Sequence, residues 1–290
     1  TEQPMDFAML NVSLLAEFFP PEDPWLSGHS IPYYYFGYLM MANLTELTSI
    51  PTSISYNLSL ALIPALSATA IFGLSYNLIR SHGCLAGRAI IFSFTAPFLL
   101  LFIGNLESVL EFINFRGLGD STFWHWIGIK DLGTGLFDQS WRPTEHMWWW
   151  RATRVIDTLD ASGRSLDYTI SEFPYFSLIL GDLHPHLMSI PFIMLLLGVT
   201  FNTFMDKDAM GKGWIYNNKL SIFVTSLTLG ALSFVNIWDF VPFFSFWIYS
   251  PLFFQAFHQY LPCRYLLPAY QVFQSLASKD CHVHQLLFHF

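Results

Sequence analysis

Residues 58–79 read LSLALIPALSATAIFGLSYNLI, and this stretch decides the class of protein. It contains no Asp, Glu, Lys or Arg, and the uncharged run that includes it begins at Leu47. An α-helix needs about 20 consecutive apolar residues to cross the hydrocarbon layer of a bilayer. Pro64 is compatible with such a helix, because neighbouring helices can satisfy the carbonyl group that a proline leaves free. The stretch therefore predicts a transmembrane helix.

The composition of the whole chain agrees with a membrane protein. Of the 290 residues, 53% are hydrophobic, 18% are aromatic and only 12% are charged. A soluble domain carries about 25% charged residues, so this chain has too few charges to cover a soluble surface. The net charge of −8 argues against a nucleic-acid partner, which requires a concentrated basic face. The three cysteines lie far apart and lack the paired spacing of a zinc site.

The other long apolar stretches predict four further spans, at residues 89–106, 187–205, 220–238 and 240–257. The expected fold is all-α: a polytopic transmembrane helical bundle with interfacial helices in its outer loops. Its parts are an outer loop (1–57), two transmembrane helices (58–106), a large outer loop with an interfacial or re-entrant helix (107–186), three transmembrane helices (187–257) and a tail (258–290). For the apolar stretches 31–42 and 173–181 we expect helices that lie in the interface or dip partway into the membrane. The alternative is that either stretch is the outer end of a full span, which would change the predicted orientation.

Two short loops predict the orientation of the chain, because short cytoplasmic loops favour Lys and Arg. The loop at 80–88 carries Arg80 and Arg88 and no acid, and the loop at 206–219 carries three lysines against two aspartates. With both loops in the cytoplasm, the acidic and histidine-rich motifs lie on the extracytoplasmic face. We expect an integral membrane protein, of the plasma membrane, that contacts membrane lipids. The chain begins at Thr1, so we expect a segment of a longer membrane protein, or a chain whose start is missing. The expected partners are the remainder of that protein or other membrane subunits.

The first candidate motif is Pro4-Met5-Asp6-Phe7. Asp6 opens an amphipathic run, and its carboxylate could act as a general base at the membrane surface. The alternative is that Asp6 caps the helix N-terminus.

A second set of candidates is aromatic or basic. Tyr33, Tyr34 and Tyr35 could stack on sugar rings, or they could form the aromatic belt usual at membrane interfaces. Arg151 and Arg154 follow a run of tryptophans and could hold a lipid phosphate or anchor the chain among the headgroups.

The third motif is Gly181-Asp182-Leu183-His184-Pro185-His186, with Glu172 ten residues before Asp182. A set formed by Asp182, His184 and His186 could bind a divalent metal, the one cofactor that the sequence suggests. The same residues could serve as an acid–base pair or hold a phosphate, or they could mark a helix end at the water boundary. Asp239, at a predicted tight turn between two spans, is either a cap or a further substrate-binding acid.

Taken together, these motifs resemble the "YYY" family of very hydrophobic, uncharacterised membrane proteins. The resemblance rests on Pro4 to Phe7, residues 20–26, Tyr33-Tyr34-Tyr35-Phe36-Gly37, residues 150–156, residues 172–177, the Asp-Leu-His-Pro-His run and residues 236–239, in that order. The layout is similar to that of the GT-C membrane glycosyltransferases, which transfer sugar from a polyprenyl-phosphate carrier at the outer face. In this sequence Phe7 follows Asp6, whereas the GT-C motif often pairs two acids.

The GT-C resemblance implies a glycosyltransferase that takes its sugar from a polyprenyl-phosphate carrier. Asp6 would be the catalytic base, and Asp182 and His184 would line the catalytic site. Arg151 or Arg154 would hold the lipid phosphate, and Tyr33, Tyr34, Tyr35, Glu172 and Asp239 would contact substrate. Two alternatives remain: a transporter or flippase for a lipid-linked or polar solute, and a non-catalytic scaffold subunit.

Overall fold

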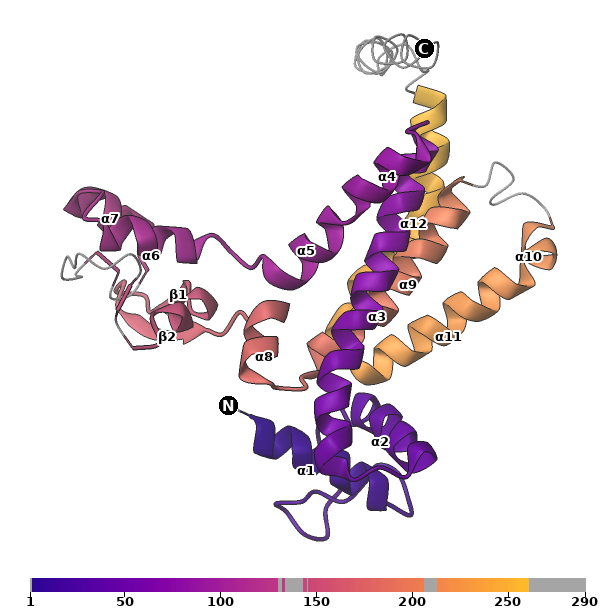
Figure 1. Ribbon diagram of the computed structural model, residues 1–290, viewed down its shortest axis with the longest axis horizontal. Helices are drawn as coiled ribbons and strands as arrows, with labels where there is room; N and C mark the ends of the chain where they lie inside the picture. The colour runs from indigo at the N-terminus through magenta and orange to yellow at the C-terminus, as the bar shows by residue number, and fades with distance from the viewer. Residues whose placement is uncertain (1, 130–131, 134–142, 145, 206–212, 261–290) are drawn as a thin grey trace, which may run out of the picture. The chain divides into compact units, whose positions relative to one another are not determined.

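The computed structural model describes residues 2–129, 132–133, 143–144, 146–205 and 213–260 (Figure 1). From residue 261 onward, the predicted tail lies outside the described residues, as does the 206–212 part of the second charged loop. The chain divides into two compact units, Thr1–Leu195 with Gly230–Asp239, and Leu196–Leu229 with Phe240–Phe290. All the candidate site residues belong to the first unit.

The elements are mostly helical. The first unit holds α1 (Gln3–Leu15), α2 (Phe36–Thr48), α3 (Thr52–Ser81), α4 (Ala86–Ser93), α5 (Thr95–Phe102), α6 (Glu107–Phe115), α7 (Ser121–Ile127), the 3-10 helix η1 (Trp148–Thr153), β1 (Ile156–Leu159), β2 (Ser165–Thr169), α8 (Pro174–Leu180) and the start of α9 (Pro185–Met205). The rest of α9, with α10 (Trp214–Asn217) and most of α11 (Lys219–Val235) and α12 (Ile237–Tyr260), belongs to the second unit.

Two helices among the described residues are long and apolar enough to cross a membrane. These are α3 and the Pro185–Thr203 part of α9, and a third is added if α4 and α5 form one span with α6 across a 75° bend. Large apolar side chains along α3, including Ile54, Leu58 and Leu66, are exposed, as expected of a helix that faces lipid. Membrane helices are therefore present, while the full set of five spans stays a prediction.

Two helix boundaries in the structure differ from those predicted. The helix expected at 31–42 begins only at Phe36 and continues to Thr48, because Pro32 and the residues around it lie in an irregular segment. The predicted corner between the last two spans falls at Asn236, where α11 has ended and α12 begins, so Asp239 lies inside the first turn of α12.

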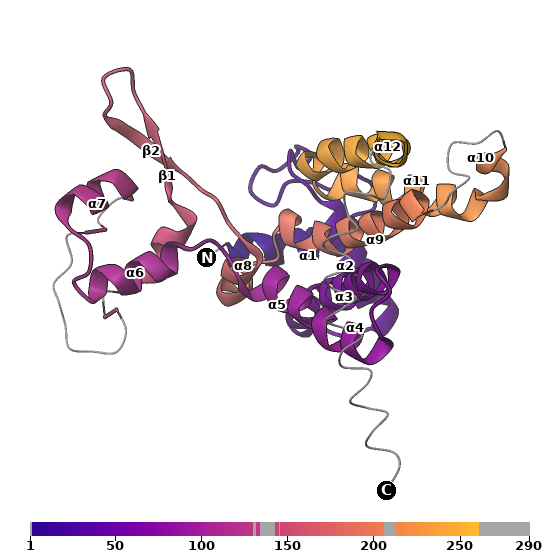
Figure 2. The same cartoon turned by 90° about the horizontal axis from the view of Figure 1, so that it is seen from above.

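The expectation of an all-α chain is wrong in one place. Within the predicted outer loop at 107–186, β1 and β2 pair antiparallel, with Ile156 opposite Thr169 (Figure 2). The Asp160 carboxylate accepts hydrogen bonds from the backbone N–H groups of Ser162 and Arg164, which closes the turn. The rest of this loop contains the short helices α6, α7 and α8, and α8 matches the interfacial helix predicted at 173–181.

The N-terminal helices pack where α3 begins, and Figure 1 shows α1 and α2 beside that end of α3. The Phe7 ring of α1 meets the Tyr56 ring of α3 edge to face, with centroids 5.8 Å apart. A Cβ at Gly37 of α2 would lie 2.5 Å from the Met188 Cε atom of α9, so α2 and α9 approach closely here and a larger residue would require the Met188 side chain to shift. These contacts bring α1, α2, α3 and the start of α9 together in the first unit.

The turn between α8 and α9 is fixed to α1 and α3 by hydrogen bonds. The Gln3 side-chain amide donates to the Leu180 carbonyl at 2.6 Å, and the Tyr56 hydroxyl donates to the Gly181 carbonyl at 3.0 Å. Gly181 adopts φ = +71°, a left-handed conformation that favours glycine. The turn can therefore reverse the chain while both carbonyls remain bonded to neighbouring helices.

Gly181→Ala is expected to destabilise the protein by more than Gly163→Ala. Both glycines have left-handed φ values, +71° and +80°, so both substitutions incur the backbone cost of about 1–2 kcal/mol. Only at Gly181 would the new Cβ meet a neighbour, the Gln3 amide, whose hydrogen bond is worth about 1 kcal/mol. The unfolding midpoints of the two variants in detergent micelles measure this difference. Equal midpoints would show that the Gln3 contact contributes nothing.

Candidate functional site

Asp6 is completely buried and both of its carboxylate oxygens accept hydrogen bonds. The Tyr38 hydroxyl donates to Oδ1 at 2.5 Å, and the backbone N–H of Leu183 donates to Oδ2 at 2.7 Å. Burial raises the pKa of the Asp6 carboxyl, an effect that the Tyr38 bond, nearby His184 and the Leu183 bond partly oppose. The N-cap interpretation of Asp6 is wrong, because α1 begins at Gln3 and Glu2 is its N-cap residue.

His184 lies among three carboxylates. Its Nε2 atom is 3.7 Å from Glu2 Oε2 and 3.8 Å from Asp182 Oδ2, and its Nδ1 atom is 3.7 Å from Glu172 Oε2. These separations exceed hydrogen-bond length, so they are electrostatic contacts. Within the described part of the chain, His184 Nε2 and Asp182 Oδ1 are buried without a hydrogen-bond partner. The imidazole is thus held in a strongly negative environment.

His186 completes the group. Its ring centroid lies 5.4 Å from that of His184, and its Nε2 atom lies 3.1 Å from the Ser177 hydroxyl of α8. One ligand atom from each of Glu172, His184 and His186 lies within 4.8 Å of the others, a set that contains Glu172 in place of the predicted Asp182. We call Glu2, Asp6, Glu172, Asp182, His184 and His186 the acid–histidine cluster. Its side chains come from the start of α1, from the turn before α9 and its first residues, and from Glu172, which lies two residues before α8.

The cluster is buried on one side and accessible on the other. Asp6 and Asp182 are buried, whereas 57% of the Glu2 side chain is exposed, so Glu2 lies at the solvent-facing edge of the cluster. Burial raises the pKa of Glu172, and the nearby His184 opposes this. The cluster therefore combines buried carboxyl groups with polar groups that approach the surface.

The two arginines have different surroundings. Arg154 interacts electrostatically with Glu172 and lies over the Trp150 ring, with its guanidinium carbon 4.2 Å from the ring centroid. Arg151 instead forms a two-point ion pair with Glu111 of α6, through Nε at 2.5 Å and Nη2 at 3.1 Å. Of the two candidates for a lipid phosphate, Arg154 is the one that adjoins the acid–histidine cluster.

The three tyrosines also differ. Burial and the charges of Asp6 and Glu2 raise the pKa of Tyr33 to about 12, which places Tyr33 in the field of the cluster. The Tyr34 ring packs against Tyr33 with centroids 5.7 Å apart, and Tyr35 stacks on Phe19. Tyr33 is therefore the tyrosine best placed to contact a molecule bound at the cluster.

Asp239 belongs to another network. Its Oδ2 atom accepts hydrogen bonds from the Ser189 hydroxyl at 2.5 Å and the Asn236 side-chain amide at 2.9 Å. These bonds connect the start of α12 to α9. The carboxylate thus has partners of its own near, but not within, the Asp-Leu-His-Pro-His turn.

Glu2, Tyr38 and Ser177 were not among the predicted site residues, although Tyr38 and Ser177 lie in the tyrosine-rich and Glu172–Ser177 motifs. Glu2 precedes Asp6 by four residues, the spacing at which helical residues share a face, and this signal was available. Tyr38 follows the triple tyrosine by three residues, yet nothing in the sequence distinguishes it as the partner of Asp6. The Ser177 contact with His186 depends on the reversal at Gly181, which local patterns do not predict.

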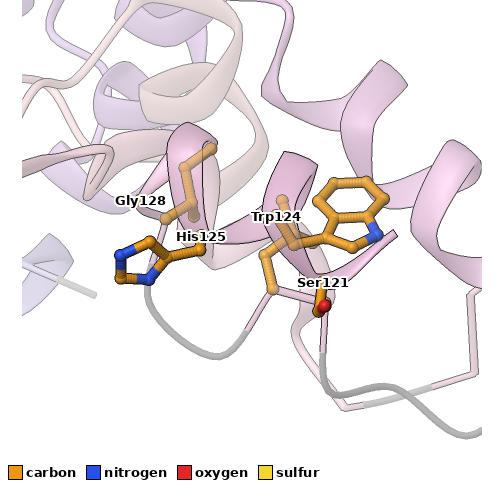
Figure 3. A pocket seen from close by; sticks show the side chains of 7 residues that line it. Ser121, Trp124, His125 and Gly128 are labelled. Carbon is orange, nitrogen blue, oxygen red and sulfur yellow. The ribbon is translucent and has the colours of Figure 1, made fainter. Parts of the chain in front are cut away.

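A separate shallow pocket of about 340 Å³ lies in the predicted outer loop (Figure 3). It is lined by Ser121, Trp124, His125, Gly128, Ile129, Leu132 and Gly133, and none of these residues belongs to the acid–histidine cluster.

Of the comparisons with known proteins, one gives a match. Neither the curated proteins nor the solved structures contain a match to this chain. A family model described as "Uncharacterized membrane protein (DUF2298)" matches residues 1–284. This match confirms the expected membrane location and an uncharacterised family. The chain belongs to this family of uncharacterized membrane proteins, DUF2298.

Proposed function

We propose that this chain carries the active site of a membrane glycosyltransferase, which transfers a sugar from a polyprenyl-phosphate carrier to an acceptor hydroxyl at the extracytoplasmic face. The observation that carries the proposal is the buried Asp6 carboxylate, bonded to Tyr38 and Leu183 beside His184, Asp182 and Glu172. Buried acids with raised pKa values and adjacent charged partners are typical of catalytic sites. The GT-C resemblance supplies the reaction class.

The reaction assigns a task to each group. The acceptor oxygen attacks the anomeric carbon of the sugar, and its proton passes to the Asp6 carboxylate. The bond between that carbon and the phosphate oxygen breaks, and its electron pair leaves with the polyprenyl phosphate. A carboxylate whose pKa lies above its ordinary value is a stronger base, so burial of Asp6 favours the proton transfer.

Arg154 is the group that stabilises the leaving phosphate. Its guanidinium is placed by the Trp150 ring and by a hydrogen bond to the Thr153 hydroxyl at 2.5 Å. Arginine is suited to phosphate because its planar fork can donate two parallel hydrogen bonds. Tyr33 and Glu172, which lie in the same electrostatic environment, would contact the sugar.

Tyr38→Phe is expected to move the acidic limb of the pH–rate profile to higher pH. The Tyr38 hydroxyl stabilises the Asp6 carboxylate and so lowers its pKa, and its removal lets burial raise that pKa further. The base must be deprotonated, so the rate falls as the pH decreases through the higher pKa of the variant. The profile of kcat/KM against pH measures the shift, with Tyr76→Phe as the control. An unmoved acidic limb in Tyr38→Phe would contradict the role of Asp6 as base.

The proposal is tested with the full-length protein in proteoliposomes that contain a polyprenyl-phosphate-linked radiolabelled hexose. Release of polyprenyl phosphate, together with labelled product that depends on an added acceptor alcohol, is the expected result. Movement of the intact donor across the bilayer without cleavage would instead support a flippase. If a panel of hexose donors is neither cleaved nor moved, the glycosyltransferase proposal is overturned.

A further inference from the structure

We propose that Glu172, His184 and His186 form a binding site for one divalent transition-metal ion of the Zn²⁺ or Mn²⁺ type. The three side chains offer two imidazole nitrogens and one carboxylate oxygen, and these ligand atoms lie within 4.8 Å of one another. The segments that contribute them, residue 172 and the start of α9, are joined by the reversal at Gly181.

The separations fit ligands around an ion better than hydrogen bonds. His184 Nδ1 and Glu172 Oε2 are 3.7 Å apart, too far for a hydrogen bond. Two atoms that each lie about 2.1 Å from a tetrahedral Zn²⁺ ion are separated by about 3.4 Å. Small rotations of these side chains would therefore let both atoms reach a common ion.

The unsatisfied atoms of the cluster give independent support. His184 is 7% exposed, and its Nε2 atom is buried with no hydrogen-bond partner among the described residues. Two carboxylates lie on that edge of the ring, with Glu2 Oε2 at 3.7 Å and Asp182 Oδ2 at 3.8 Å from Nε2, and Asp182 Oδ1 is itself buried without a partner. A histidine that binds a metal through one nitrogen usually donates its other N–H to a carboxylate. If Nδ1 binds the metal, the Nε2–H group faces the Glu2 and Asp182 carboxylates, and the buried Nε2 atom acquires a role.

The charge balance also favours a cation. Four carboxylates, Glu2, Asp6, Glu172 and Asp182, lie around His184, and Glu172 interacts electrostatically with both His184 and Arg154. Buried like charges are costly unless a counter-charge pairs with them. A divalent ion would supply that counter-charge.

The ligand set determines the class of ion. Imidazole nitrogens suit Zn²⁺ and related transition-metal ions, and a carboxylate also suits Mn²⁺, whereas Ca²⁺ and Mg²⁺ prefer sites made of oxygen atoms. Three protein ligands leave at least one coordination position for another molecule. If the proposed glycosyl transfer holds, an oxygen of the carrier phosphate is the natural occupant of that position, while the metal site itself stands independently of the reaction.

The test measures metal binding directly. Full-length protein, purified with a tag that lacks histidine, is treated with a chelator, incubated with ZnCl₂ or MnCl₂ alone and freed of excess metal. Elemental analysis is expected to find about one ion per chain in the wild type. Glu172→Gln and His184→Asn should lower the affinity at least 100-fold, and Asp182→Asn should lower it about 10- to 100-fold, as partners of metal-bound histidines do. His82→Asn, at an exposed histidine, is the matched control and should bind as the wild type does.

A second measurement uses the wild-type protein alone, so it tests the proposal even if the variants fail to fold. X-ray absorption of the wild-type protein loaded with Zn²⁺ should detect two imidazole ligands. Absence of stoichiometric metal in the wild type, a spectrum without imidazole, or unchanged binding in folded His184→Asn protein would each overturn the proposal. Because these experiments use no sugar donor, their failure is separate from a failure of the glycosyltransferase proposal.

Discussion

Full-length Asp6→Asn protein is expected to lose sugar transfer by about 10²–10⁴-fold, the usual contribution of general acid–base catalysis. The substitution removes the charge with little change in shape. The asparagine Oδ1 atom can accept the Leu183 N–H bond, while its amide donates to the Tyr38 hydroxyl, which can act as donor or acceptor. The fold can therefore tolerate the change, whereas the proposed sugar transfer has lost its base.

Two further measurements separate chemistry from structure in this experiment. The unfolding midpoint of Asp6→Asn should lie close to that of the wild type, and binding of the polyprenyl-phosphate sugar should persist. Asp157→Asn, in β1, is the matched control and should retain wild-type activity. Wild-type activity in Asp6→Asn would rule out Asp6 as the base, and loss of both folding and donor binding would assign Asp6 a structural role instead.

Arg151→Met should destabilise the protein by about 3–5 kcal/mol, the cost of leaving a buried partner charge uncompensated. The ion pair is largely removed from solvent, because 17% of the Arg151 side chain and 3% of the Glu111 side chain are exposed. Glu107 lies one helical turn before Glu111 and is also buried, so the loss of Arg151 leaves two buried carboxyl groups near one another. The free energy of unfolding in detergent micelles measures the effect.

The chain provides a matched control for this ion pair. Arg164 pairs with Asp160 at 3.2 Å in the hairpin turn, but 83% of the Arg164 side chain is exposed. Exposed pairs contribute about 0–1 kcal/mol, so Arg164→Met should have a small effect. The double variant Arg151→Met with Glu111→Met should recover much of the lost stability, because apolar side chains can replace a buried pair. If Arg151→Met costs no more than Arg164→Met, the buried pair does not stabilise the fold.

The parts of the fold that the sequence predicts well are those determined by composition and length. The uncharged run that contains residues 58–79 forms α3, and the short apolar stretch at 173–181 contains α8 (Pro174–Leu180). A membrane imposes a minimum apolar length, and that constraint can be read directly from a sequence. Helix ends depend on local turns, which explains why the helix expected at residue 31 begins at Phe36.

The hairpin was missed although a signal for it exists. Ile156 and Thr158 lie on a segment with β-branched residues, and the Asp160 to Gly163 turn separates it from a second such segment. A strongly hydrophobic composition favours membrane helices, and the short strand pattern lies in a polar loop, so no strand was predicted there. The hairpin is short and confined to the predicted outer loop, so it leaves the membrane helices unchanged.

The sequence predicted the motifs that form the candidate site, but not which of their residues contact one another. Asp6 and residues 182–186 were predicted as separate candidate motifs. The hydrogen bond that joins them, between Asp6 and Leu183, connects residues 177 positions apart. The proposed metal ligands include Glu172, whereas the sequence predicted Asp182. The reason is the chain reversal at Gly181, which determines which carboxylate faces His184 Nδ1. Arg151 and Arg154 are three residues apart, and only packing decides which one adjoins the cluster.

The long separation between Asp6 and Leu183 also bears on how the protein is made. During synthesis Asp6 leaves the ribosome first, and its backbone partner follows 177 residues later. Until then the carboxylate has no N–H donor from that turn, and α1 cannot acquire its final environment. Contacts of such long range are slow to form, since a large loop must close before they contribute. A nascent chain arrested before Leu183 would thus lack this partner of Asp6, and the acid–histidine cluster is complete only once the start of α9 has been synthesised.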